Sequence, residues 1–260
     1  MADERTAVAD LVRLLGAHVA WQRTCGTESL PRSSDAPAIV RNRQEPKLDA
    51  TLNPPTHPVA APSGPLGSEE KLHRLGVLQE EIRPCTRCRL HEARTQTVFA
   101  RGNPLASLVF VGEGPGRDED KQGLPFVGAA GQLLDKIIAG MGLTEKDVYI
   151  CNVVKCRPPE NRPPLPDEMA TCGPYLSRQL SYVQPTVIVA LGKTAASYLL
   201  RASEPMAALR GKWHAYEGMA VRVTWHPAYL LRQPSAKRDT WEDMKVVLQR
   251  LGRSIPAKGG

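Results

Sequence analysis

Residues 107–116 read Ser-Leu-Val-Phe-Val-Gly-Glu-Gly-Pro-Gly, an apolar run that stops in a glycine-rich turn. A run of this kind, bounded by glycine and proline, is typical of a strand buried on both faces of a sheet. Further apolar, β-rich runs follow along the chain, and stretches with helical spacing of apolar residues separate them. Strands that alternate with helices predict an α/β fold whose mostly parallel, four-stranded sheet is covered by helices on both faces.

These elements define a compact domain over residues 69–253. Its predicted strands are Ser107–Val111, Val148–Val154, Thr186–Leu191 and Ala220–Trp225, and its predicted helices are 128–141, 167–182, 193–201 and 239–251. A helix over Ser68–Ile82 is expected before them. Ser68 is predicted as its N-cap, because a serine side chain can accept a hydrogen bond from the first free N–H groups of a helix.

The two ends of the chain differ from this domain in composition. Apolar residues at helical spacing predict a helix over residues 5–22, within an N-terminal segment 1–26. Residues 27–68 hold eight prolines and few large apolar side chains. Such a segment buries too little surface to offset its ordering entropy, which predicts a disordered proline-rich linker. Residues 254–260 are interpreted as a short C-terminal tail.

Charge and targeting signals restrict the partners and the compartment. The net charge is +7 and the pI about 9.2, which favours a polyanionic partner because phosphates exchange their counterions for Lys and Arg. The sequence contains no signal peptide and no run of about 18 apolar residues, so we expect a cytoplasmic protein that does not enter a membrane. Thiols stay reduced there, so clustered cysteines indicate metal ligands before disulfides.

Four of the six cysteines form two pairs that suit one metal centre. Cys85 and Cys88 are a C-x2-C pair, and 15 residues separate Cys156 from Cys172. The 67 residues between the two pairs make the predicted site a clamp that spans the fold, whereas a compact zinc ribbon has its pairs closer together.

The other two cysteines are interpreted as non-ligands. Cys151 falls inside a predicted strand and is interpreted as a small buried hydrophobe, and Cys25 is interpreted as a free thiol. Four sulfur ligands alone do not distinguish zinc from an iron–sulfur cubane.

A polar or glycine-rich element follows each predicted strand. These elements are Gly112–Gly116, Asn152, Gly192-Lys193-Thr194 and His226-Pro227. In an open parallel sheet, ligands bind outside the carboxyl ends of the strands. Each element alone also suits a tight turn, a loop cap, a helix start or a surface histidine, but their convergence on one edge favours a functional site.

With these motifs in this order, the chain from Cys85 to Leu251 resembles the family 4 uracil-DNA glycosylases of bacteria and archaea. The motifs are Gly112-Glu113-Gly114-Pro115-Gly116 with Glu119-Asp120, Gly123-Leu-Pro-Phe126-Val-Gly128, Asn152-Val-Val-Lys-Cys156-Arg-Pro-Pro with Cys172, and His226-Pro-Ala-Tyr-Leu-Leu-Arg232. The resemblance implies the three-layer α/β/α glycosylase fold. It also implies a structural [4Fe–4S] cluster held by Cys85, Cys88, Cys156 and Cys172.

The resemblance further implies an enzyme that flips uracil out of single- or double-stranded DNA and hydrolyses its N-glycosidic bond, which initiates base-excision repair. Phe126 is expected to stack on the uracil, Asn152 to recognise its edge, and backbone N–H groups around Gly114 to hold it. His226 is expected to donate a hydrogen bond to uracil O2. Glu113 has three open roles: it orients the water, stabilises the sugar cation, or shapes the wall near C5 that excludes thymine.

Two comparisons within the superfamily refine this assignment. One variant bonds covalently to the abasic site through a histidine in a basic insert, but Glu119–Phe126 reads EDKQGLPF, with neither insert nor histidine. We therefore expect ordinary turnover. Another family has an apolar residue at the position of Glu113, which argues against membership of that family.

Contacts with DNA are expected from two further segments. Lys193 begins a predicted helix, and helix N-termini bind phosphate. Leu231 or Leu230 is expected to fill the gap left by the flipped base, with Arg232 on the DNA backbone. We expect a monomer that acts at the nucleoid. Two other hypotheses remain, namely a module that binds damaged DNA without cleaving it and a zinc-stapled hydrolase of another substrate.

Overall fold

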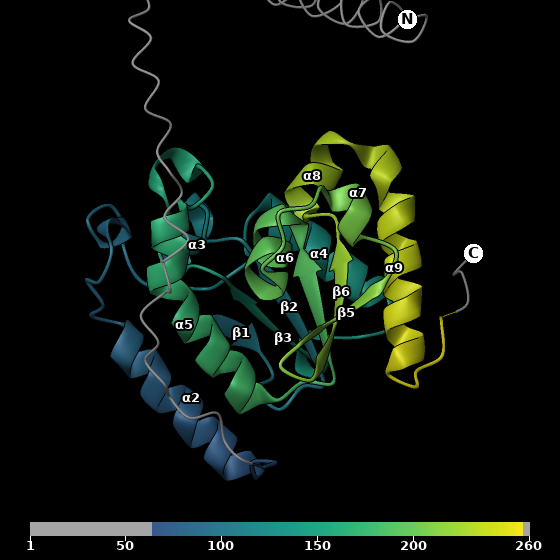
Figure 1. The fold of residues 1–260 in the computed structure, drawn as a ribbon, viewed down its shortest axis with the longest axis horizontal. Coiled ribbons are helices and arrows are strands. Elements are labelled where there is room, and N and C mark those ends of the chain that lie inside the picture. The colour runs from purple at the N-terminus through teal and green to yellow at the C-terminus, as the bar shows by residue number, and fades with distance from the viewer. Residues whose placement is uncertain (1–63, 257–260) are drawn as a thin grey trace, which may run out of the picture. The chain divides into compact units, whose positions relative to one another are not determined.

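The structure is a computed structural model that describes residues 64–256. The predicted helix over 5–22, Cys25, most of the predicted linker 27–68 and the last four residues of the chain lie outside this range. Helices cover both faces of one central sheet, which confirms the predicted three-layer α/β/α fold (Figure 1).

Six strands form the sheet, in the order β1-β3-β2-β4-β6-β5. The four inner strands are parallel, and they are β3 (Val148–Asn152), β2 (Leu108–Gly112), β4 (Val187–Leu191) and β6 (Met219–Thr224). They confirm the predicted strands, although β3 ends at Asn152 and not at Val154.

The prediction of four strands was incomplete, because a short strand pairs antiparallel at each edge of the sheet. These edge strands are β1 (Ala100–Gly102), beside β3, and β5 (Trp213–Tyr216), beside β6. They contain three and four residues and are mostly half-buried, so neither contains the apolar run by which a buried strand is recognised.

Alternate residues of β2 point into two separate cores. Val109 and Val111 pack in the core that includes α2 (Ser68–Ile82), α5 (Pro166–Val183) and α6 (Gly192–Leu200). Leu108 and Phe110 pack in the core that includes α4 (Ala129–Gly140) and α9 (Lys237–Arg250). Because side chains alternate along a strand, an uninterrupted apolar run supplies both cores.

The remaining elements are short. They are α3 (Arg117–Gln122), α7 (Met206–Leu209), α8 (Pro227–Arg232) and the 3-10 turns η1 (Arg89–His91), η2 (Glu145–Asp147), η3 (Pro159–Asn161) and η4 (Pro234–Ala236).

The start of α2 corrects one detail of the prediction. The helix begins at Ser68, as predicted, but the residue at the N-cap is Gly67, and no side chain caps this end. Ser68 is therefore the first helical residue and not the N-cap. No helix between residues 64 and 256 is both long and apolar enough to cross a membrane.

Candidate active site and cysteine pocket

The ends of β2 and β3 bring two predicted site residues into contact. Gly112 and Asn152 are partners in the parallel register of these strands. A Cβ atom added at Gly112 would collide with Oδ1 of Asn152 and with the ring of Phe126. Only glycine at this position lets both side chains approach the end of β2, so the glycine-rich turn has a structural reason beyond chain reversal.

The side chain of Asn152 is buried and incompletely hydrogen-bonded. The residue is 1% exposed, and its Oδ1 has no hydrogen-bond partner within the described part of the chain. A buried acceptor without a donor costs about 1–3 kcal/mol, so Oδ1 is suited to a donor supplied by a ligand. The backbone carbonyl of Asn152, in contrast, accepts a hydrogen bond of 2.7 Å from Nζ of Lys155.

Phe126 has an unusual backbone conformation that neighbouring residues hold in place. Its φ of 57° lies in the left-handed region, which is uncommon for a residue with a side chain. Arg101 of β1 donates hydrogen bonds to the carbonyl oxygens of Pro125 (2.8 Å) and Phe126 (3.2 Å). The Arg101 guanidinium is itself paired with Asp135 at 2.5 Å. These contacts fix the Phe126 ring against the end of β2.

Glu119 of α3 joins the two loops that carry Glu113 and Phe126. One carboxylate oxygen accepts hydrogen bonds from the backbone N–H groups of Val127 (2.9 Å) and Gly128 (2.8 Å). The other accepts from the backbone N–H of Gly116 at 3.1 Å. The carboxylate therefore fixes the spacing between the loop after β2 and the loop before α4.

His226 lies beside Phe126, with ring centroids 5.7 Å apart. Its Nδ1 accepts a hydrogen bond from the backbone N–H of Ala228 at 3.2 Å, so the proton of the neutral ring is assigned to Nε2. Burial, and then the charge of Arg232, lower the pKa of His226 to about 4. The histidine is therefore a neutral hydrogen-bond donor at physiological pH.

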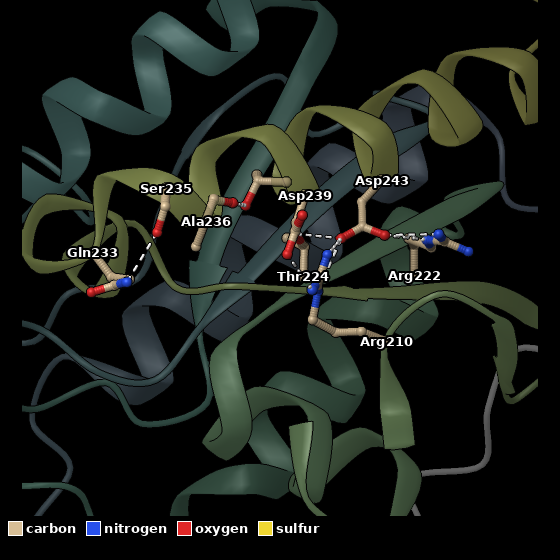
Figure 2. A network of polar contacts seen from close by, with 9 residues as sticks. Arg210, Arg222, Thr224, Gln233, Ser235, Ala236, Asp239 and Asp243 are labelled. Carbon is tan, nitrogen blue, oxygen red and sulfur yellow. Dashed lines mark hydrogen bonds and ion pairs between the residues drawn. The ribbon is translucent and has the colours of Figure 1, made fainter. Parts of the chain in front are cut away.

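A buried ionic network supports the strand that leads to His226 (Figure 2). Asp243 of α9 accepts hydrogen bonds from Arg222 (2.7 Å), Arg210 (2.8 Å) and Thr224 (2.8 Å). Arg222 and Thr224 belong to β6, which ends two residues before His226. Removal of one partner from a buried ion pair typically costs about 3–5 kcal/mol, because it leaves the other charge buried and unpaired, so loss of Asp243 is expected to disturb the end of β6.

Glu113 is held by a residue that the sequence had not singled out as its partner. Oγ1 of Thr194, in the first turn of α6, donates a hydrogen bond to Oε2 of Glu113, 81 positions away. Gly192, the first residue of α6, has a φ of 84°, and a Cβ there would lie 2.9 Å from Cβ of His226. The start of α6 therefore lies against both Glu113 and His226.

The structure thus brings together the four side chains that the sequence predicted to share a site. We call Glu113, Phe126, Asn152 and His226 the strand-end site. They come from the carboxyl ends of β2, β3 and β6 and from the loop before α4. Gly114 is half-buried beside them, and the carbonyl of Glu113 accepts a hydrogen bond of 3.1 Å from the backbone of Val154.

A second feature, the cysteine pocket, lies where α2, the segment after β3 and α5 meet. Its lining includes all four predicted ligands, Cys85, Cys88, Cys156 and Cys172. The other lining residues are Ile82, Arg87, Arg94, Lys155, Thr171 and Tyr175. Cys151 lies in β3 and is not part of the lining, which agrees with its interpretation as a buried hydrophobe.

Several hydrogen bonds connect the segments around the cysteine pocket. Arg94 donates to the carbonyl of Cys85 (2.6 Å) and to Sγ of Cys156 (3.1 Å). The backbone N–H of Lys155 donates to Sγ of Cys172 at 3.3 Å. Such N–H donors favour thiolate ligands over neutral thiols.

Burial raises the pKa of the Cys172 thiol to about 12 and also raises the pKa of Cys156 and of Cys88. These thiols are therefore protonated at neutral pH unless a metal group replaces the protons.

Comparison with known proteins identifies the family. Residues 99–245 match the family model described as the Uracil DNA glycosylase superfamily. The chain is 42% identical over 193 residues to the type-4 uracil-DNA glycosylase of Archaeoglobus fulgidus, over 71% of this chain and 97% of that relative. It is 46% identical over 175 residues to the type-4 enzyme of Thermotoga maritima, over 65% of this chain and 90% of that relative.

The chain belongs to the type-4 uracil-DNA glycosylase family. The resemblance inferred from the motifs is thereby confirmed, as is the glycosylase-like fold. The type-5 uracil-DNA glycosylase of Pyrobaculum aerophilum is a more distant relative, 29% identical over 194 residues, with 68% of this chain and 84% of that relative covered. The higher identity to the type-4 relatives agrees with the presence of Glu113, at whose position another family of the superfamily has an apolar residue.

The side chains that the sequence predicted to contact DNA differ in how exposed they are. Leu231 is 47% exposed at the end of α8, whereas Leu230 is fully buried. The prediction of Leu230 as an alternative wedge was therefore wrong. Successive residues of a helix point in different directions, so Leu230 faces the core whereas the next residue, Leu231, faces solvent. Arg232 is exposed. Lys193 is partly exposed, and its Nζ donates to the carbonyl oxygen of Glu204.

Proposed function

We propose that the protein is a uracil-DNA glycosylase, which takes a uracil nucleotide out of single- or double-stranded DNA and hydrolyses its N-glycosidic bond. The product is an abasic site, the first intermediate of base-excision repair. Membership of the type-4 family and the convergence of the strand-end site support this proposal. An enzyme cannot reach the glycosidic bond inside a duplex, so the site must receive a flipped base.

The unpaired Oδ1 of Asn152 is the observation that carries the proposal. Uracil presents an N3–H donor beside the O4 acceptor, and the Asn152 amide offers the complementary acceptor and donor. Cytosine presents the reversed pattern, so a fixed amide excludes it. Because β3 and the Gly112 contact restrict this side chain, its orientation is set before the base arrives. Phe126 lies beside it and is suited to stack on the pyrimidine ring.

Bond cleavage requires stabilisation of negative charge on the leaving uracil. As the C1′–N1 bond breaks, its electron pair moves onto the uracil and charge develops on O2. His226 is suited to donate its Nε2–H to O2, since Nδ1 is occupied by the N–H of Ala228. A donor aimed at developing charge is worth about 2.7–4 kcal/mol. A backbone N–H near Gly114 would supply a second donor of this kind.

A water molecule completes the reaction by bonding to C1′ of the sugar and losing a proton. Glu113 is the carboxylate of the strand-end site, and it accepts a hydrogen bond from the hydroxyl of Thr194, which restricts its orientation. Its three roles remain as proposed, namely orienting the water, stabilising the sugar cation or forming the wall near uracil C5.

The four cysteines are proposed to hold a [4Fe–4S] cluster. The pocket supports this, because all four thiols line it. Four thiolates suit either one zinc ion or an iron–sulfur cluster, and membership of the type-4 family favours the cluster. When bound, the cluster would cross-link three segments of the fold.

The exposed end of α8 is proposed to contact the DNA. Leu231 is suited to enter the stack where the base has left, and Arg232 to bind the phosphate backbone. Lys193 would have to leave the carbonyl of Glu204 to reach a phosphate. We propose that the protein acts as a monomer on DNA at the nucleoid.

An excision assay on oligonucleotides tests this function. A labelled strand with one uracil, single-stranded or paired with guanine, is incubated with the purified protein, and abasic sites are revealed by alkaline cleavage. We expect cleavage at the uracil position and none in matched strands with cytosine or thymine. Tight binding of uracil-containing DNA without any cleavage would contradict the proposal and favour a binding module.

A further inference from the structure

Lys155 is a buried lysine that lies between the cysteine pocket and the strand-end site. Its side chain is 0% exposed and is among the largest fully buried side chains of the described residues. It lines the cysteine pocket, and Cys156 follows it in the chain. The mechanism described above does not use it.

Both ends of Lys155 are occupied by contacts with functional segments. Its backbone N–H donates to Sγ of Cys172 at 3.3 Å. Its Nζ donates to the backbone carbonyl of Asn152 at 2.7 Å and to Oε1 of Gln179. One residue therefore contacts a predicted cluster ligand with its backbone and the uracil-recognising residue with its side chain.

Gln179 provides a fixed partner for the Lys155 amino group. It is fully buried in α5, and its Nε2 donates to the carbonyl of Phe99 (3.3 Å) and to the hydroxyl of Tyr149 (3.0 Å). Because both groups of the Gln179 amide are used, its orientation is determined, and so is the position of Nζ.

The cost of burying the Lys155 amino group indicates that it orients its partners and does not mainly stabilise the fold. No carboxylate among the described residues pairs with Nζ of Lys155, so the cost of burying the amino group is offset by its two hydrogen bonds and by the nearby cysteine sulfurs when these are ionised. An apolar side chain of similar volume would fill the same space without that cost. The β1–β3 ladder ends at the pair Ala100–Cys151, one residue before Asn152. Lys155 supplies a contact just beyond it.

We propose that Lys155 is a positioning residue for uracil recognition, which holds the Asn152 carbonyl at a place set by the cysteine pocket. The amide of Asn152 then points where N3–H and O4 of the base arrive. The occupied cysteine pocket thereby fixes base recognition through Lys155, in addition to its effect on folding. This inference rests on the proposed function, since it assumes that Asn152 binds uracil.

The test compares Lys155→Met with a matched destabilising control, Val247→Ala. Methionine is unbranched and only one atom shorter than lysine, and it removes the N–H donors, whereas Val247 is buried in the core on the α4 and α9 face. For each protein we would measure iron content, melting temperature, single-turnover uracil excision and inhibition by free uracil.

We expect Lys155→Met to lower the excision rate roughly 100-fold, because a small displacement of a recognition group can have an effect of this size. The inhibition constant of free uracil should rise about tenfold, which corresponds to one weakened hydrogen bond. Val247→Ala should lower only the melting temperature.

A second variant, Gln179→Leu, keeps the Lys155 amino group and removes its other acceptor. We expect an intermediate loss of rate and of uracil inhibition, with iron retained. The inference would be overturned if both variants kept the wild-type rate and inhibition constant, whatever their melting temperatures. It would also be overturned if Lys155→Met lost iron and rate together while Gln179→Leu changed neither. Failure of the wild-type protein to excise uracil would instead refute the proposed function.

Discussion

The strand-end site and the cysteine pocket are assembled in different ways. Three of the four strand-end residues lie at or just after the ends of parallel strands, where the sheet register brings them together, and Phe126 comes from the loop before α4. The cysteines come from the segment after α2, the loop after β3 and the interior of α5, which no common sheet joins. The difference indicates that the sheet positions most of the strand-end site, whereas the proposed cluster would cross-link the segments of the cysteine pocket.

The hydrogen bonds around the two regions support the same distinction. Each strand-end residue has a dedicated anchor, such as Thr194 for Glu113 and Arg101 for the Phe126 loop. In the cysteine pocket, one arginine side chain, Arg94, contacts two of the cysteine segments. Variants in the two regions should therefore fail differently, in chemistry at the strand ends and in folding at the pocket.

The largest expected effect is the loss of a cysteine ligand. Cys156→Ala should remove the cluster, its absorbance near 400 nm and the cross-link between segments. We expect the melting temperature to fall by about 10 °C or more, since about 3–5 kcal/mol is lost in a domain of this size. Cys151→Ala is the matched control, because Cys151 is buried but does not line the pocket, and it should keep both iron and colour. Iron retained in Cys156→Ala and lost in Cys151→Ala would reverse the ligand assignment.

The next effect is confined to chemistry. His226→Ala should lower the single-turnover excision rate roughly 100-fold or more, because a donor to the developing charge on O2 is lost. Affinity for uracil-containing DNA and the melting temperature should stay close to those of the wild type. An equal loss of DNA affinity and rate would instead place His226 in DNA binding.

A smaller effect is expected where an anchor and not the reacting group is removed. Thr194→Val leaves the carboxylate of Glu113 without its hydroxyl donor, and we expect about a tenfold slower excision. Thr194→Ser keeps the hydroxyl and should restore most of the rate. Equal rates for the valine and serine variants would show that the hydrogen bond is unimportant.

The smallest change is expected when the pH is varied, because the excision rate should not depend on protonation of His226 near neutral pH. Because burial lowers the pKa of His226 to about 4, the ring stays neutral well below its usual pKa of about 6.5. Its contribution to folding is complete above about pH 6.5 and is lost as the pH falls towards about 4. Single-turnover excision should therefore be constant between about pH 5.5 and 8. A step in the rate near pH 6.5 would mean that His226 titrates normally.

The inner sheet was predictable from the sequence because each buried strand is an uninterrupted apolar run, such as Leu108–Gly112. The grouping of Glu113, Asn152 and His226 followed, since parallel strands present their ends on one edge. Contacts between distant segments were not predictable. The partners Thr194 and Glu113 lie 81 positions apart, and no spacing rule connects them.

Side-chain direction within a helix was also beyond the sequence. Leu230 and Leu231 are identical in type, and only the rotation of α8 buries one and exposes the other. Similarly, nothing in the sequence showed that Lys155 is buried, with Gln179 and the Asn152 carbonyl as the acceptors of its amino group.

Asn152→Asp tests the central claim most directly, which is that the strand-end site recognises uracil through one fixed amide. Excision rates would be measured on duplexes that carry uracil or cytosine opposite guanine. We predict slower excision of uracil, measurable excision of cytosine, and a uracil-to-cytosine rate ratio at least about tenfold lower than in the wild type. An unchanged ratio in a folded, iron-containing variant would contradict the account.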